Sequence, residues 1–258
     1  MTDLTRLQRE GLGMLLAFDH VCRRHGIAYQ LAAGTLLGAI RHGGFIPWDD
    51  DVDVCLRRAA YERFLAVAPA ELAPAYRLRQ ARTEPGCPFP FCKMVSGEGE
   101  TGSGAFLDIF PFDGVCPGPV RGRLHMRLAW LLATALAYRA GKAAPGDRSP
   151  TRARRWARQV LVWGMRGLAP QRLAGGLERV ARWREGRANA HVACLVSGRM
   201  RYRQIRSARD FDACIAWSFE GHPFPVPRSY ETVLENLYGD WRALPPAERR
   251  QPHHHRLT

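Results

Sequence analysis

Four carboxylates within five positions are the strongest chemical feature of this sequence. Asp49, Asp50 and Asp51 are consecutive, and Asp53 follows after one valine. The segment 51–56 is otherwise apolar, which predicts a buried strand. Side chains at alternate positions of a strand point to the same face. We therefore expect the carboxyl groups of Asp51 and Asp53 to lie close together.

Two carboxylates this close repel each other unless a proton or a cation lies between them. Ligand sets made only of oxygen, beside a phosphate, typically hold Mg²⁺ or Mn²⁺. We predict that Asp51 and Asp53 bind such an ion. The competing interpretation is an acidic turn on a solvated surface. Asp49 and Asp50 either orient the metal ligands or cap the strand.

A Gly-Thr turn precedes the acidic run and opens an apolar helix over residues 34–41. Gly34 and Thr35 would offer backbone N–H groups, a hydroxyl and the positive end of a helix dipole, which together can hold a phosphate. Arg41 would add positive charge. Most Gly-Thr turns bind no ligand, but one that is followed by an Asp-x-Asp strand indicates a phosphate site more specifically.

Three blocks of sequence carry a resemblance to a known family. The first is residues 29–64, which include the Gly-Thr turn and the Pro-Trp-Asp-Asp-Asp-Val-Asp run. The second is Phe106–Gly114, and the third is Tyr238–Trp241 with the Leu-Pro-Pro that follows at 244–246. In this order and composition they resemble the LicD family, which includes fukutin-like proteins.

The resemblance implies an α+β fold, with a nucleotidyltransferase-like mixed sheet flanked by helices. Such folds use three acidic residues, which here would be Asp51, Asp53 and a third on a neighbouring strand. Asp108 matches the third, because residues 105–110 form an apolar run with one charge. Burying a lone carboxylate costs several kcal/mol, so Asp108 needs a metal or a basic partner. The alternative is that Asp108 ends the strand and caps a turn.

The resemblance also implies a metal-dependent transferase. It would move a phosphocholine-like group from a nucleotide-activated donor such as CDP-choline to a hydroxyl of a cell-surface glycan, of the lipopolysaccharide or teichoic acid type. Relatives move other phospho-alditol or sugar-phosphate groups, so the donor headgroup stays open. Two alternatives remain: a nucleotidyltransferase acting on RNA, and an inactive membrane-bound scaffold. The complete set of three aspartates argues against the scaffold.

Two further sets of residues have two interpretations each. Lys93, on an expected strand, either meets a donor phosphate or extends to solvent. His253, His254 and His255 near the C-terminus are either solvated or place one ring near the phosphate.

Length and composition favour one catalytic domain over residues 1–258, with a basic helical insertion over 119–190. The chain has 258 residues, of which 46% are hydrophobic, so a sizeable core is available. The N-terminus lacks the pattern of a signal peptide. The seven cysteines are an odd number without paired spacing, which argues against a disulfide framework. We expect a cytoplasmic protein, peripheral on the inner face of the membrane.

Positive charge is concentrated in one segment. The net charge of the chain is +14, and residues 121–190 contain fifteen Arg and one Lys against three acidic residues. The segment also holds four of the seven tryptophans. It is interpreted as a surface for anionic membrane, as a nucleic-acid patch, or as a solvated face of an Arg-rich chain. The first and last are equally favoured, and nucleic acid is the least favoured.

The hydrophobic pattern predicts the remaining elements. The helices are expected over residues 4–24, 59–68 (ended by Pro69) and 230–238, and strands over 27–31, 76–80 and 91–95.

Overall fold

The computed structural model describes residues 3–84, 87, 89–96, 104–139, 163–164, 167, 169–197 and 205–252. The chain divides into two compact units. Unit 1 comprises Met1–Leu78, Lys93–Phe112 and Arg206–Thr258, and unit 2 comprises Arg79–Cys92 and Asp113–Ile205. The expected insertion, residues 119–190, lies within unit 2. A single domain over 1–258 stays a prediction.

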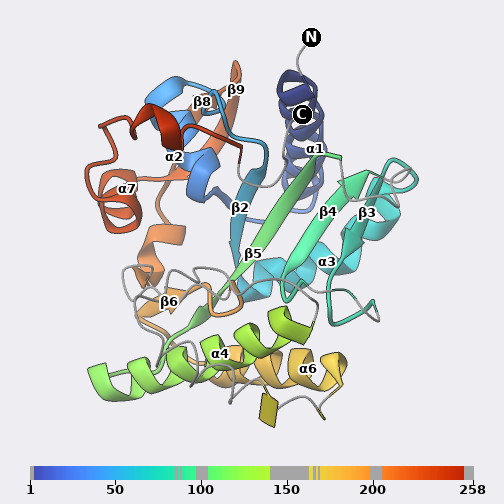
Figure 1. The fold of residues 1–258 in the computed structure, drawn as a ribbon, viewed down its shortest axis with the longest axis vertical. Helices are drawn as coiled ribbons and strands as arrows, with labels where there is room; N and C mark the ends of the chain where they lie inside the picture. Colours follow the sequence, from blue (N-terminus) through green and yellow to red (C-terminus); the bar gives the residue numbers. More distant parts are fainter. Residues whose placement is uncertain are drawn as a thin grey trace. The chain divides into compact units, whose positions relative to one another are not determined.

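A mixed β-sheet forms the centre of unit 1, with strand order β1-β2-β5-β4-β3 (Figure 1). Strand β1 is antiparallel to β2, whereas β2 and β5 are parallel. The strands are β1 (Gln30–Leu31), β2 (Val52–Arg57), β3 (Tyr76–Arg79), β4 (Cys92–Ser96) and β5 (Phe106–Gly114). The predicted α+β class and mixed sheet are confirmed.

Helices pack against this sheet through apolar side chains. The ring of Phe18, in the first helix, lies 4.9 Å from the ring of Tyr29, just before β1. It lies 4.7 Å from the ring of Phe64, in the helix that follows β2. All three residues are buried. The helices of unit 1 are α1 (Asp3–Arg24), α2 (Ala33–His42), α3 (Arg58–Leu72) and α7 (Tyr230–Tyr238), with 3-10 turns at Ala208–Phe211 and Ala247–Arg249.

Helix α3 differs from its prediction. Pro69 was expected to end it, but the helix continues to Leu72. A proline inside a helix costs about 3 kcal/mol or more because it lacks an N–H and its ring crowds the preceding turn. Ala68 and Leu72, on either side of Pro69, are both buried. Tertiary packing of the last turn therefore outweighs the local preference.

A β-hairpin fixes the segment that leads from α2 into the acidic run. Its strands are β8 (Cys214–Phe219) and β9 (His222–Pro227). At the hairpin turn, Glu220 donates its N–H to Gly43 O (2.9 Å), and its carboxylate accepts from Phe45 N–H (2.9 Å). Trp217 Nε1 donates to Ala39 O at 3.0 Å. These contacts of the hairpin with α2 and the segment after it were not predicted from the sequence.

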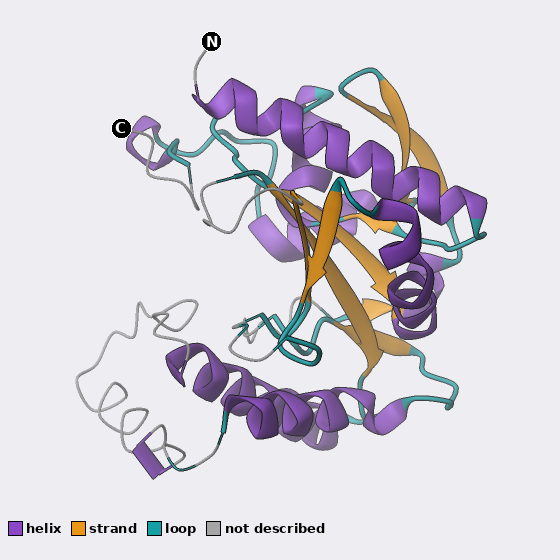
Figure 2. Cartoon of the chain, turned by 90° about the vertical axis from the view of Figure 1, so that its right-hand side faces the viewer, coloured by secondary structure: helices purple, strands orange, loops and turns teal. Residues whose placement is uncertain are grey.

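Two packed helices form most of the described part of unit 2. Helices α4 (Pro119–Arg139) and α6 (Pro170–Ala181) lie side by side in both Figure 1 and Figure 2. Apolar residues of both helices, including Leu136 and Leu173, share one core cluster. The remaining elements are β6 (His191–Ala193), which pairs with the end of β5, and a 3-10 turn at Arg182–Arg184; β7 (Arg206–Ser207) belongs to unit 1.

The described part of the predicted insertion is largely helical, as expected. Residues 140–162, which carry much of its positive charge, lie outside the described residues. Among the helices that the structure describes, none is long and apolar enough to span a bilayer.

The close packing at Gly38 gives a stability prediction. A Cβ at Gly38 of α2 would lie 2.5 Å from the backbone oxygen of Gly44, whereas one at Gly175 of α6 would meet nothing within 4 Å. We expect Gly38→Ala to lower the free energy of unfolding by about 1–3 kcal/mol, because backbone cannot move aside cheaply. Gly175→Ala, the matched control, should raise it by up to about 1 kcal/mol. Urea denaturation measures both, and equal effects would contradict the prediction.

Candidate active site

The three predicted acidic residues meet on two neighbouring parallel strands. Asp53 of β2 and Asp108 of β5 are register partners, and Asp51 immediately precedes β2. One carboxylate oxygen from each of the three lies within 4.8 Å of the other two. Asp53 and Asp108 are buried, and Asp51 is half-buried. Three acidic groups from two separate parts of the chain therefore converge.

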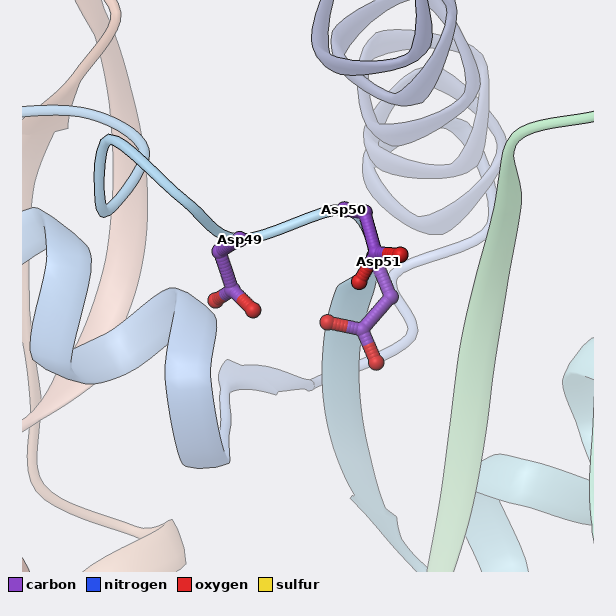
Figure 3. A group of neighbouring side chains, drawn as sticks. All are labelled: Asp49, Asp50 and Asp51. Atoms are coloured by element: carbon purple, nitrogen blue, oxygen red, sulfur yellow. The ribbon is translucent and has the colours of Figure 1, made fainter. Parts of the chain in front are cut away.

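Asp49 and Asp50 form a second group with Asp51, again with one oxygen of each within 4.8 Å of the others. Figure 3 shows all three leaving the segment that enters β2, with Asp49 on the side of α2. A Cβ at Gly34 would lie only 2.6 Å from Asp49 Oδ2. The first turn of α2 thus already faces a carboxylate, which its helix dipole favours.

Helix α1 holds the segment that carries these aspartates. Gln8 Nε2 donates to the backbone oxygens of Asp49 (2.9 Å) and Ile46 (3.3 Å). Because one side-chain amide contacts two backbone positions, the acidic segment is fixed to a long helix.

The start of α2 fixes Asp53 through its backbone. Asp53 donates its N–H to Thr35 Oγ1 (2.8 Å), and its backbone oxygen accepts from Ala32 N–H (2.9 Å). Thr35 is buried, and Ala33 between them has φ +40°, which is unusual for a residue with a Cβ. Thr35 and Ala32, at the start of α2, therefore position Asp53. The role of the Gly34-Thr35 turn as a phosphate site stays a prediction.

Lys93 of β4 is the basic partner of Asp108. The two side chains form a buried ion pair, and the Lys93 ammonium also lies 3.3 Å from the ring centroid of Phe106. Phe106 and Asp108 are two positions apart on β5 and so share a face. The alternative in which Lys93 extends to solvent is wrong, because the residue is 7% exposed.

Arg41 is engaged with the C-terminal part of unit 1. Its Nη1 donates to Trp241 O (2.9 Å) and Ala243 O (3.3 Å), and its Nε donates to His42 Nε2 (3.0 Å). Burial lowers the pKa of Arg41; burial and the Arg41 charge lower the pKa of His42, so its ring is neutral at pH 7 and can accept this bond. The predicted phosphate role of Arg41 is untested.

Trp48, directly before the acidic run, packs among side chains that sequence reasoning did not link to it. The His42 ring lies 6.5 Å from the Trp48 ring, and the Arg250 guanidinium lies 5.6 Å from it. His253, His254 and His255 follow closely in sequence but lie outside the described residues.

Cys55 shares the Asp53 face of β2 but is unsuited to chemistry. Burial raises the pKa of Cys55 to about 11. The thiol is therefore protonated at neutral pH, whereas nucleophilic attack and metal ligation both need the thiolate.

The donor set of Asp51, Asp53 and Asp108 fits a hard divalent cation. Carboxylate oxygens are the ligands preferred by Mg²⁺ and Mn²⁺. Lys93 pairs with Asp108, and a divalent cation would offset the repulsion among the three close carboxylates in this largely buried place. These acidic residues can bind a metal ion.

Comparisons with known proteins bear on this site. The family model described as LicD/FKTN/FKRP, nucleotidyltransferase domain, matches residues 26–133, which include all three aspartates. The lipopolysaccharide cholinephosphotransferase LicD of Haemophilus influenzae is 28% identical over 255 residues, covering 94% of this chain and 92% of the relative. The ribitol 5-phosphate transferases FKRP of mouse and human are 62% identical over 29 residues, 11% of this chain and 6% of each relative.

An α+β unit with converging carboxylates, together with these matches, defines the class of the protein as an enzyme, a transferase. Over residues 26–133 the chain matches the model of the LicD family, and the predicted resemblance to this family is confirmed.

The charge balance of the site gives one prediction. Without divalent cation, Asp51→Asn should change the free energy of unfolding less than Asp108→Asn, because Asp51 is only half-buried and its replacement relieves repulsion. Asp108→Asn should lower it by about 3 kcal/mol, because Lys93 loses its buried anion. Added Mg²⁺ should stabilise the wild type by binding the folded state, and Asp51→Asn much less. Urea denaturation with EDTA or Mg²⁺ tests this; full Mg²⁺ stabilisation of Asp51→Asn would contradict it.

The hydrogen bond between Thr35 and Asp53 gives a second testable prediction for the site. Thr35→Val keeps the shape but leaves the buried Asp53 N–H without its acceptor, so we expect a loss of about 1–3 kcal/mol in the free energy of unfolding. Thr35→Ser restores the hydroxyl and serves as the matched control. Amide hydrogen exchange at Asp53 should accelerate in the valine variant alone. Equal protection in both variants would show that this bond does not hold Asp53.

Proposed function

We propose that this enzyme transfers a phospho-substituent, such as phosphocholine, from a nucleotide-activated donor of the CDP-choline type to a hydroxyl group of a cell-surface glycan. The acceptor class that we favour is lipopolysaccharide. The proposal draws on the Haemophilus influenzae relative, a lipopolysaccharide cholinephosphotransferase whose match spans 94% of this chain.

The observation that carries the proposal is the convergence of Asp51, Asp53 and Asp108, with one oxygen of each within 4.8 Å of the others. Phosphoryl-group transfer needs little covalent chemistry from a protein. It needs groups that position the donor and compensate negative charge. A divalent cation at this site, Mg²⁺ or Mn²⁺, would supply positive charge to the donor phosphates.

Each residue of the site has a proposed part. Asp51 and Asp53 hold the cation, with Asp53 fixed by its backbone bonds to Ala32 and Thr35. Asp108, oriented by Lys93, either completes the cation site or accepts the proton of the attacking hydroxyl.

Positive groups near the carboxylates would receive the donor. Lys93 is close to the carboxylates through Asp108, and its charge favours a neighbouring phosphate. Gly34 and Thr35 would contribute from the start of α2, where backbone N–H groups favour anions. At this position a donor phosphate would compete with the carboxylate of Asp49. Arg41 would act from the other end of α2 only by giving up carbonyl contacts.

A donor panel tests the reaction. Purified protein is incubated with CDP-choline, CDP-ribitol and other nucleotide-linked donors, with a lipopolysaccharide acceptor fraction and Mg²⁺ or Mn²⁺, and nucleoside monophosphate release is measured. We expect release of CMP from one CDP-alcohol, abolished by EDTA. Asp53→Asn should reduce turnover by more than about 100-fold. Mutating a residue that only holds a metal ligand in place already lowers metal affinity or activity by about 10–100-fold.

The matched control is Asp212→Asn, which removes an exposed carboxylate at a turn outside the site. Its turnover should equal that of the wild type. If no donor gave metal-dependent turnover, the proposal would be rejected. The two alternatives, an RNA nucleotidyltransferase and an inactive scaffold, would then be favoured. An equal loss in both variants would mean that the site has been assigned to the wrong carboxylates.

A further inference from the structure

Helix α4 is apolar on more than the face that packs against α6. Its inner side buries His125, Met126 and Ala129. On the outer side, Val120 is 76% exposed and Leu124 is 66% exposed. A helix of a soluble protein normally confines its apolar residues to one stripe, and one that is apolar all round is usually covered. The outer side of α4 therefore exposes two aliphatic side chains, which contact with water alone does not favour.

The exposed apolar residues lie next to arginines. Val120 and Leu124 are four positions apart and so are neighbours along one side of the helix. Arg121 and Arg127 are exposed, and with about 100° of rotation per residue they fall on the two sides of this pair. We call Val120, Arg121, Leu124 and Arg127 the outer face of α4.

Helix α4 contributes positive charge to this face and no acidic group of its own. The sequence Pro119–Arg139 contains no Asp or Glu. On the neighbouring helix, Glu178 pairs with Arg82 (3.3 Å) and Arg182 (3.6 Å). Glu185 pairs with Arg182 at 2.6 Å. Both glutamates therefore have arginine partners outside the outer face of α4.

We propose that the outer face of α4 docks on an anionic phospholipid bilayer. Apolar side chains flanked by arginines are the composition of helices that lie in the bilayer interface. Val120 and Leu124 would enter the boundary between headgroups and acyl chains, while Arg121 and Arg127 would contact lipid phosphates. Juxtamembrane basic residues gain affinity from the negative surface potential of such a leaflet.

The exposed aliphatic pair favours lipid over nucleic acid as the occupant. A nucleic-acid backbone is recognised by positive and polar groups, and single strands add aromatic stacking. Neither Val120 nor Leu124 offers these contacts, and placing them against phosphates would leave apolar surface without a partner. A bilayer interface accommodates both kinds of side chain at once.

Vesicle co-sedimentation tests the proposal with the full chain and without donor or acceptor, so its outcome is independent of the proposed reaction. Vesicles contain phosphatidylcholine alone or with phosphatidylglycerol. We expect binding only with phosphatidylglycerol, decreasing as salt rises. Val120→Ser/Leu124→Ser and, separately, Arg121→Gln/Arg127→Gln should each weaken binding by about tenfold or more.

Arg172→Gln/Arg187→Gln is the matched control, because it removes the same charge from exposed positions elsewhere in unit 2. It should bind almost as well as the wild type, and circular dichroism melts should agree among all variants. The proposal is overturned if the wild type does not bind the anionic vesicles. It also fails if the control weakens binding as much as the α4 variants, or if the protein binds single-stranded RNA in place of vesicles.

Discussion

Mutual repulsion among three close carboxylates is the constraint around which unit 1 is organised. Asp51, Asp53 and Asp108 hold oxygens within 4.8 Å of one another in a place where water is largely excluded from two of them. Like charges at this separation are unfavourable unless a positive group compensates them. Lys93 supplies one such charge from the next strand. The parallel pairing of β2 and β5 forces the approach, since it makes Asp53 and Asp108 register partners.

Holding these groups together requires contacts from distant parts of the chain. Thr35 and Ala32 fix the backbone of Asp53, Gln8 of α1 holds the segment at Asp49, and Glu220 of the hairpin holds it at Phe45. Each bond contributes only about 1 kcal/mol net, but leaving its buried partner unsatisfied costs more. The arrangement is therefore rigid because several modest bonds restrain one short segment, which is the preorganisation that group transfer needs.

Local patterns in the sequence predict the strands and the burial of the acidic residues, whereas the resemblance to a family implied that Asp108 joins Asp51 and Asp53. Alternation after Asp51 predicts β2, and one charge in an apolar run predicts that Asp108 is buried and needs a partner. The identity of that partner did not follow, because the pairing of β4 with β5 depends on the assembled sheet. Glu220 was missed for the same reason: it acts on Phe45 across 175 positions of sequence. Pro69 was misjudged because burial of Leu72 outweighs its local preference.

The two proposed activities, group transfer and membrane binding, belong to regions of opposite charge. Residues around the acidic site concentrate negative charge that needs a cation, whereas residues 121–190 hold most of the net charge of +14. A glycan acceptor built on a lipid stays at a membrane, and an enzyme held at the same surface searches two dimensions instead of three. Affinity from a few arginines and two aliphatic side chains is modest and reversible. Such affinity is suited to repeated turnover, because the enzyme must leave each modified acceptor to reach the next.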